Sequence, residues 1–183
     1  MARARGAPHD MTIRVFPVAS VPGVHFSNDF GVPRPGDRAH AGIDIFAPRG
    51  TPALAVDNGT VRFEIDPIGG LSYYLRAADS TTYYGTHLSG VEGSPRSVRA
   101  GEVIGYVGND GNAAGTPPHL HFEVHPGGRA AVNPFLELSA APRQAARATA
   151  GTTALKALAL AGGLGAAWWW YARAGGARVI ARL

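Results

Sequence analysis

The chain has 183 residues, of which 45% are hydrophobic, so it is long and apolar enough for one globular domain and is not wholly disordered. It contains no cysteine, which excludes disulfides and thiolate metal sites; a metal would need histidine and carboxylate ligands. The net charge of +4 comes largely from the two ends, with no basic stripe interleaved with aromatic residues, so we expect no nucleic-acid partner.

Residues 1–20 contain Arg3 and Arg5 but no continuous apolar segment, because Arg14 and Pro17 interrupt the apolar residues there. A secretory signal peptide needs an apolar core of at least about seven residues. We therefore interpret residues 1–20 as an N-terminal extension without a recognisable signal peptide and expect the folded domain to begin at residue 21.

Residues 21–138 consist of short apolar runs broken by Gly, Pro, Asn and Asp, which favours strands and turns. Residues 51–56 and 60–65 are separated by an Asp-Asn-Gly sequence, typical of a strand–turn–strand unit. Residues 71–76 and 81–87 predict a second strand pair. No segment of this region keeps a helical period over ten residues. The sequence thus predicts a mainly β fold, a single small antiparallel β-sheet domain.

Residues 118–124 predict a strand with two chemically different faces. Alternate side chains of a strand point to opposite faces, so three apolar side chains share one face and three polar ones share the other: His119, His121 and Glu123. Two imidazoles on one strand face can serve one metal centre, one as ligand and one as neighbour. A pair of surface histidines on an edge strand is the alternative at this point.

Two further positions upstream carry candidate site residues. His40 and Asp44 are four residues apart in a segment that Gly42 makes strand-like or turn-like, and both side chains can share a face there; an exposed histidine and a turn aspartate are the alternative. His87 ends the run Tyr-Tyr-Gly-Thr-His. The remaining histidines have no patterned neighbours and are expected at the surface: His9, His25 and His125.

Taken together, the motifs His-x-x-x-Asp from His40, Tyr-x-x-His-Leu from Tyr84 and His-Leu-His-Phe-Glu from His119 resemble those of the lysostaphin-type zinc endopeptidases, which cleave peptidoglycan cross-links. The resemblance covers about residues 22–137, and its motifs occur in the family's order. It implies a twisted antiparallel sheet with a narrow groove over it and zinc at the floor of the groove.

By this resemblance His40, Asp44 and His121 would be the zinc ligands, with one coordination position left open, as in catalytic zinc sites. His119 would be the general base, and His87 would stabilise the transition state or protonate the leaving amine. Glu123 either orients an imidazole or faces solvent.

One departure concerns a tyrosine that some family members carry shortly before the first ligand. This chain has Pro-Arg-Pro-Gly-Asp-Arg at residues 33–38, so Arg34 or Arg38 takes that place, or nothing does.

The implied function is that of a zinc-dependent endopeptidase of the cell envelope, hydrolysing peptide bonds in peptidoglycan stem peptides or cross-bridges. A non-catalytic cell-wall module that regulates another hydrolase, and a phage lysis or virion component, are the alternatives.

Residues 139–183 differ in composition from the rest of the chain and are predicted to form a basic linker and a hydrophobic helical tail. Residues 154–172 contain Lys156 as their one charged group, and their aromatic end is followed by Arg173, a pattern typical of a membrane interface. We expect membrane attachment through residues 154–172; a soluble packing helix and a disordered tail are the alternatives.

Overall fold

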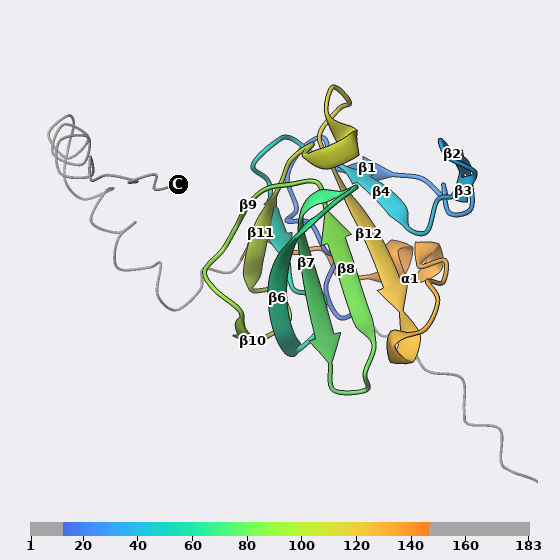
Figure 1. The fold of residues 1–183 in the computed structure, drawn as a ribbon. Helices are drawn as coiled ribbons and strands as arrows, with labels where there is room; N and C mark the ends of the chain where they lie inside the picture. Colours follow the sequence, from blue (N-terminus) through green and yellow to red (C-terminus); the bar gives the residue numbers. More distant parts are fainter. Residues whose placement is uncertain (1–12, 147–183) are drawn as a thin grey trace, which may run out of the picture. The chain divides into compact units, whose positions relative to one another are not determined.

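The computed structural model describes residues 13–146 (Figure 1). The membrane-attaching segment predicted at residues 154–172 lies outside the described residues, as do most of the predicted linker and tail (147–183) and most of the predicted N-terminal extension. Within the described part, none of the helices combines the length and apolarity that crossing a bilayer requires.

Among residues 13–146, seven strands form one antiparallel sheet in the order β1-β4-β12-β8-β7-β6-β10 (Figure 1). The strands in that order are β1 (His25–Phe26), β4 (Ile43–Phe46), β12 (His119–His125), β8 (Thr82–Thr86), β7 (Gly70–Ala77), β6 (Gly59–Asp66) and β10 (Arg96–Val98). The histidine strand β12 therefore lies inside the sheet, between β4 and β8. The predicted mainly β, antiparallel class is confirmed.

The described residues also form a second sheet, of three antiparallel strands. Its strands are, in spatial order, β5 (Pro52–Leu54), β11 (Val103–Val107) and β9 (Leu88–Val91). A separate hairpin is made by β2 (Pro33–Arg34) and β3 (Arg38–Ala39). The helical segments within residues 13–146 are short: η1 (Gly111–Ala113), η2 (Pro126–Gly128) and α1 (Phe135–Ala140).

The two predicted strand pairs have different outcomes. The strands at residues 71–76 and 81–87 pair with each other as β7 and β8. Those at residues 51–56 and 60–65 exist as β5 and β6 but belong to different sheets. β6 pairs with β7 over eight residues, whereas β5 has three residues and pairs with β11. Residues 55–58, between β5 and β6, thus carry the chain from one sheet to the other.

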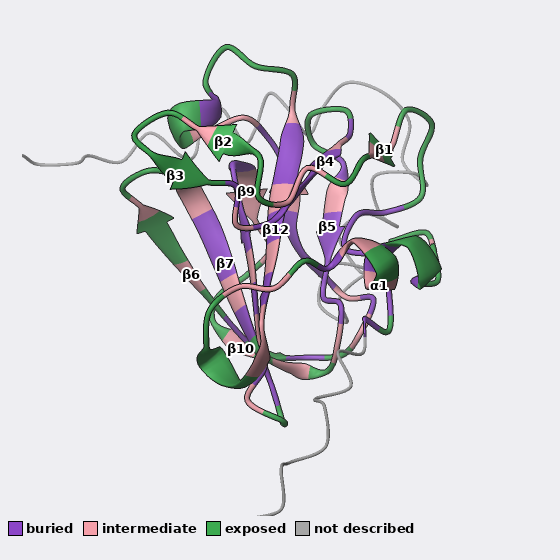
Figure 2. Ribbon diagram, turned by 90° about the vertical axis from the view of Figure 1, so that its right-hand side faces the viewer, coloured by how far each residue is buried: buried purple, intermediate pink, exposed green. Residues whose placement is uncertain are grey.

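The larger hydrophobic core contains residues of both sheets, with buried residues gathered on strands such as β7 and exposed ones in the surrounding loops (Figure 2). The apolar face of β12 is fully buried, as the alternation predicts: Leu120, Phe122 and Val124. Phe16 and Val18 also belong to this core, and Val18 forms a β-bridge with Ala53. Part of the predicted N-terminal extension is therefore packed into the domain; the domain limits at residues 21 and 138 stay predictions.

Gly42 lies where the chain enters β4 next to β12. A Cβ atom at this position would lie 2.3 Å from the backbone oxygen of Phe122 and 2.9 Å from its carbonyl carbon. These atoms belong to a strand inside the sheet, so they cannot move aside as a flexible side chain would. The absence of a side chain at Gly42 allows the segment that carries His40 and Asp44 to lie against β12.

Candidate metal centre and active site

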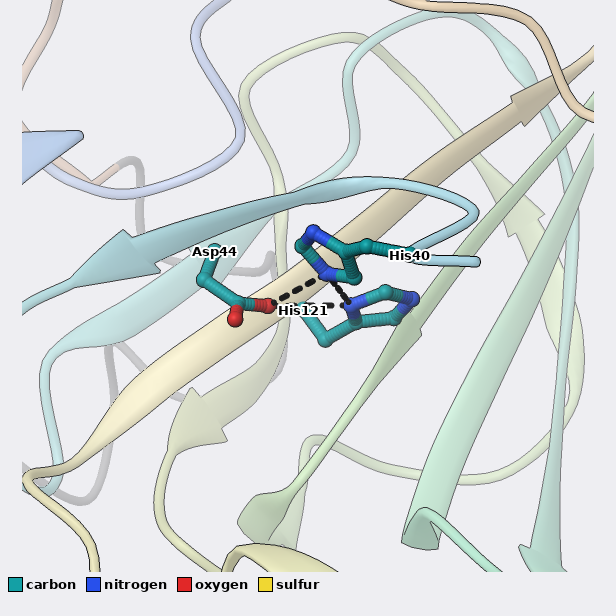
Figure 3. Close-up of side chains that lie close together, drawn as sticks. All are labelled: His40, Asp44 and His121. Atoms are coloured by element: carbon teal, nitrogen blue, oxygen red, sulfur yellow. Dashed lines mark hydrogen bonds and ion pairs between the residues drawn. The ribbon is translucent and has the colours of Figure 1, made fainter. Parts of the chain in front are cut away.

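The strand register brings His40, Asp44 and His121 together. In the β4–β12 pair His121 lies directly opposite Asp44, so the two side chains point to the same face of the sheet. His40 follows β3, and its backbone bonds to Gly31 and Val32 extend the β2–β3 hairpin towards β4. Figure 3 shows the three side chains converging from these elements.

Three atoms of these side chains lie within hydrogen-bonding distance of one another. Asp44 Oδ1 is 3.0 Å from His40 Nε2 and 3.0 Å from His121 Nδ1, and the two nitrogens are 2.8 Å apart (Figure 3). Within residues 13–146, these three side chains are close enough together to hold one metal ion. The three predicted ligands are therefore brought together in the fold.

In His40 and His121, the ring nitrogen that points away from Asp44 (the outer nitrogen) shows by its hydrogen-bond partner which nitrogen of the ring carries the proton. His40 Nδ1 lies 2.8 Å from the backbone oxygen of Asp29, and His121 Nε2 lies 2.8 Å from Glu123 Oε1. Because both oxygens are acceptors, these outer nitrogens are the donors. The inner nitrogens of the neutral rings then carry lone pairs, so three acceptor atoms converge on one point. A cation satisfies all three, and two imidazoles with a carboxylate are a donor set that suits zinc.

The same contacts shift the pKa values in the cluster. Burial lowers the pKa of His121, but hydrogen bonds to Asp44 and Glu123 outweigh it and raise the pKa to about 9. Burial raises the pKa of Asp44, yet the hydrogen bonds from His121 and His40 hold it well below its ordinary value. Without a metal, a proton on His121 therefore fills the electrostatic role of a cation in this cluster.

His87 and His119 lie beside the three convergent side chains, with their ring centroids 4.9 Å apart. The Nδ1 atom of His119 is 2.9 Å from the backbone oxygen of Pro117, and Nδ1 of His87 is within 2.9 Å of two backbone oxygens, those of Gly69 and Asp110. Both rings therefore donate through Nδ1 and, when neutral, have a lone pair at Nε2. His119 Nε2 is 3.9 Å from Asp44 Oδ1, which directs it to the cluster.

The backbone of His87 adopts a left-handed conformation, with φ of 66°, which is uncommon for a residue other than glycine. Burial and the neighbouring His119 lower the pKa of His87, so its ring is neutral at pH 7. Such strained, buried positions occur preferentially at functional sites, where the surrounding structure imposes them.

Glu123 turns towards the cluster and not to solvent. Its Oε1 accepts from His121, and its Oε2 lies 2.6 Å from His125 Nε2. Of the three histidines expected at the surface, His25 is exposed, His9 lies outside the described residues, and His125 is half-buried against Glu123. The expectation for His125 is therefore wrong, although the alternation along β12 places it on the same face as His121 and could have revealed it.

Two further residues contact the cluster. The sequence left the choice between Arg34 and Arg38 open and gave no indication of Asp29. Arg34 Nη2 lies 2.6 Å from Asp44 Oδ2, so of the two arginines considered in this segment it is Arg34 that reaches the cluster. Arg38 is exposed, and its Nε donates to the backbone oxygen of Pro35. Asp29, eleven residues before His40, contacts both His40 and Arg34 and was not anticipated.

The cluster opens into a cavity of about 670 Å³. Its lining includes Arg34 of the β2–β3 hairpin, Ile68 in the β6–β7 turn and Thr116 in the loop after η1. The polar face of β12 lies along this cavity, which is large enough to take a peptide segment.

Comparisons with known proteins agree with this geometry. The model of peptidase family M23 matches residues 38–134. The DD-carboxypeptidase/endopeptidase Mpg of Neisseria meningitidis is 41% identical over 98 residues, which are 53% of this chain and 22% of that protein. The L-Ala–D-Glu endopeptidase of Bacillus subtilis is 34% identical over 99 residues, 49% of this chain and 30% of that protein.

Among solved structures, the catalytic domain of the antimicrobial peptidase lysostaphin from Staphylococcus simulans matches with a TM-score of 0.58 at 27% identity, covering 63% of this chain and 92% of that domain. The alignments span less than a third of the length of either curated relative. The family model covers more than half of the 183 residues and includes His40, Asp44, His87, His119 and His121. The chain therefore belongs to peptidase family M23.

Proposed function

We propose that this chain is a zinc-dependent endopeptidase that hydrolyses peptide bonds in peptidoglycan stem peptides or cross-bridges. The observation that supports it most is the convergence of three acceptor atoms, from His40, Asp44 and His121, in the lining of a cavity. Two further imidazoles, His87 and His119, are anchored by backbone oxygens beside that point. Such a site has the ligands and the proton-transfer groups of metal-assisted hydrolysis.

In this proposal His40 Nε2, Asp44 Oδ1 and His121 Nδ1 hold the zinc ion. When bound, zinc supplies a Lewis acid that polarises the scissile carbonyl and makes water a nucleophile near neutral pH. His119 takes the proton of the attacking water through Nε2. His87 would stabilise the developing oxyanion or protonate the leaving amine in its protonated form, in which Nε2 carries a hydrogen, since Nδ1 already donates to backbone oxygens.

The substrate class rests on family membership and on two relatives, a DD-carboxypeptidase/endopeptidase and an L-Ala–D-Glu endopeptidase. A peptidoglycan substrate implies action in the cell envelope. Attachment to a membrane through residues 154–172 is a further proposal, which rests on the composition of that segment. The convergent ligand set favours an enzyme over a non-catalytic regulatory module, because a module would not need to retain it.

Metal removal tests the function. After dialysis against a chelator, the 183-residue chain should release no new amine termini from purified peptidoglycan, and adding one equivalent of zinc should restore the release. Magnesium serves as the control, because it prefers oxygen ligands and should not restore cleavage at this nitrogen-rich site. Cleavage that survives complete zinc removal, or a zinc-loaded chain inactive on every peptidoglycan type, would reject the proposal.

Zinc affinity should also depend on pH because His121 must lose a proton before Nδ1 can bind the ion. Its pKa of about 9 in the metal-free protein means that a proton competes with zinc throughout the neutral range. The apparent affinity should rise about tenfold per pH unit from pH 7 to 8 and level off above the pKa of His121.

Folding stability of the metal-free protein should change with pH in the opposite direction to zinc affinity. The protonated His121 stabilises the fold fully below its ordinary pKa of 6.5, and this stabilisation is lost as the pH rises through about 9. Competition titrations with a chromophoric chelator, and urea unfolding of the metal-free chain, measure the two trends. A zinc affinity that does not change between pH 7 and 8 would contradict the protonated state of His121.

A further inference from the structure

Arg34 gives the two oxygens of Asp44 different surroundings. Oδ1 faces His40 and His121 at 3.0 Å each, whereas Oδ2 accepts a hydrogen bond of 2.6 Å from Arg34 Nη2. A carboxylate held in this way presents one oxygen to the cluster and keeps the other outside it. The contact is charge-assisted and short, which makes it stronger than a neutral hydrogen bond.

Asp29 connects Arg34 to His40, the second proposed ligand that this network contacts. The carboxylate of Asp29 lies 3.4 Å from Arg34 Nη2, and its Oδ1 accepts from the backbone N–H of Asp44 at 3.3 Å. The backbone oxygen of the same residue accepts from His40 Nδ1 at 2.8 Å. Asp29 and Arg34 thus form a closed network around the outer sides of His40 and Asp44.

The charge of Arg34 is not explained by the hairpin that carries it. In the β2–β3 pair Arg34 lies directly opposite Arg38, and like charges in this position destabilise a strand pair. Arg38 is exposed, whereas Arg34 lies between the carboxylates of Asp29 and Asp44. The arginine at position 34 therefore offsets the repulsion of two nearby carboxylates, and its partners lie at the cluster and not in the hairpin.

We propose that Arg34, supported by Asp29, is a positioning residue that fixes Asp44 as a one-oxygen ligand. The inference rests on the proposed function for the identity of the metal site. Without the guanidinium, the carboxylate can rotate and bring both oxygens to the ion, and the charges of Asp29 and Asp44 are no longer balanced. Mutation of a residue that orients a metal ligand in this way typically lowers metal affinity about 10–100-fold.

Zinc affinity of the metal-stripped 183-residue chain tests the proposal without relying on catalysis. Arg34→Gln should weaken zinc binding about 10–100-fold in competition with a chromophoric chelator. Arg38→Gln, on the same hairpin, is the matched control and should bind zinc as the wild type does. With cobalt(II) in place of zinc, Arg34→Gln should shift the visible absorption bands, because the coordination by Asp44 changes; Arg38→Gln should not.

Arg34→Lys separates geometry from charge, because lysine keeps the positive charge but lacks the planar fork of arginine. It should recover only part of the zinc affinity and keep an altered cobalt spectrum. The proposal would be overturned if Arg34→Gln kept the zinc affinity and the cobalt spectrum of the wild type. If Arg34→Lys recovered both completely, the role of Arg34 would be its charge and not the positioning of Asp44.

If Arg34→Gln does not fold, as judged by thermal unfolding of the metal-free chain, Arg34→Lys and Asp29→Asn carry the test. Both should weaken zinc binding, and wild-type affinity in both would reject the proposal. A wild-type chain that binds zinc but cleaves no peptidoglycan would reject the proposed function while leaving these affinity comparisons valid.

Discussion

Replacing His121 with alanine is expected to abolish both zinc binding and peptide cleavage. The substitution removes Nδ1 from a set of three convergent acceptor atoms, and the remaining two provide too few ligands for a stable catalytic site. The loss of zinc affinity should exceed the roughly 100-fold loss that follows removal of a residue that only hydrogen-bonds to a ligand. Metal analysis of the purified chain should find one zinc per wild-type molecule and none in His121→Ala.

The matched control for this variant is His25→Ala, which removes an exposed histidine from β1, the edge strand of the same sheet. It should retain one zinc ion and the wild-type rate of amine release. Thermal unfolding of the metal-free forms shows whether His121→Ala is folded. A folded His121→Ala variant that still binds zinc tightly and cleaves peptidoglycan would contradict the assignment of His121 as a ligand.

The second large effect concerns His119 and His87, which should be needed for cleavage but not for zinc binding. Their Nε2 atoms are free to exchange protons because their Nδ1 atoms donate to backbone oxygens. Removing a general acid or base typically lowers the rate about 10²–10⁴-fold. His119→Ala and His87→Ala should therefore retain one zinc ion and lose cleavage by that factor, the opposite pattern to a ligand variant.

The pH dependence of kcat/KM distinguishes the two roles. If His119 is the general base, His119→Ala should lose the decline in activity at low pH, because that decline reports protonation of the base. If His87 acts as an acid, His87→Ala should lose the decline at high pH. Loss of zinc from either variant would instead indicate that the histidine is a ligand or supports one. The lowered pKa of His87 makes this comparison important, because an acid must be protonated before it can donate.

The histidine strand could be predicted because its information is local. Leu120, Phe122 and Val124 alternate with His119 and His121, and a strand with one buried face requires that pattern. The antiparallel class followed from the turn residues in the same way. The pairing of β5 with β11, by contrast, depends on partners about fifty residues apart, and an Asn-Gly turn does not reveal whether the flanking strands share a sheet.

The parts of the site that sequence reasoning missed depend on contacts between distant segments. Asp29 supports His40 through a backbone oxygen, a group that every residue carries, and its carboxylate meets Arg34 and Asp44 only once the chain is folded. Arg34 and Arg38 were equivalent in the sequence, and the hairpin geometry decides that Arg34 reaches Asp44. His125 is different: it continues the alternation of β12, but the predicted strand ended at residue 124, so the contact of His125 with Glu123 was not expected.

The close approach of Gly42 to Phe122 bears on how related sequences are compared. A search pattern that retains only the ligands, His-x-x-x-Asp, accepts any residue at the middle position, yet a single methyl group there would meet the carbonyl of β12. A divergent homologue with His and Asp in register but a bulky residue between them could not bring the two strands together in this way. A side chain at position 42 would therefore mark a homologue that cannot build the cluster in this form, even where both ligands are retained.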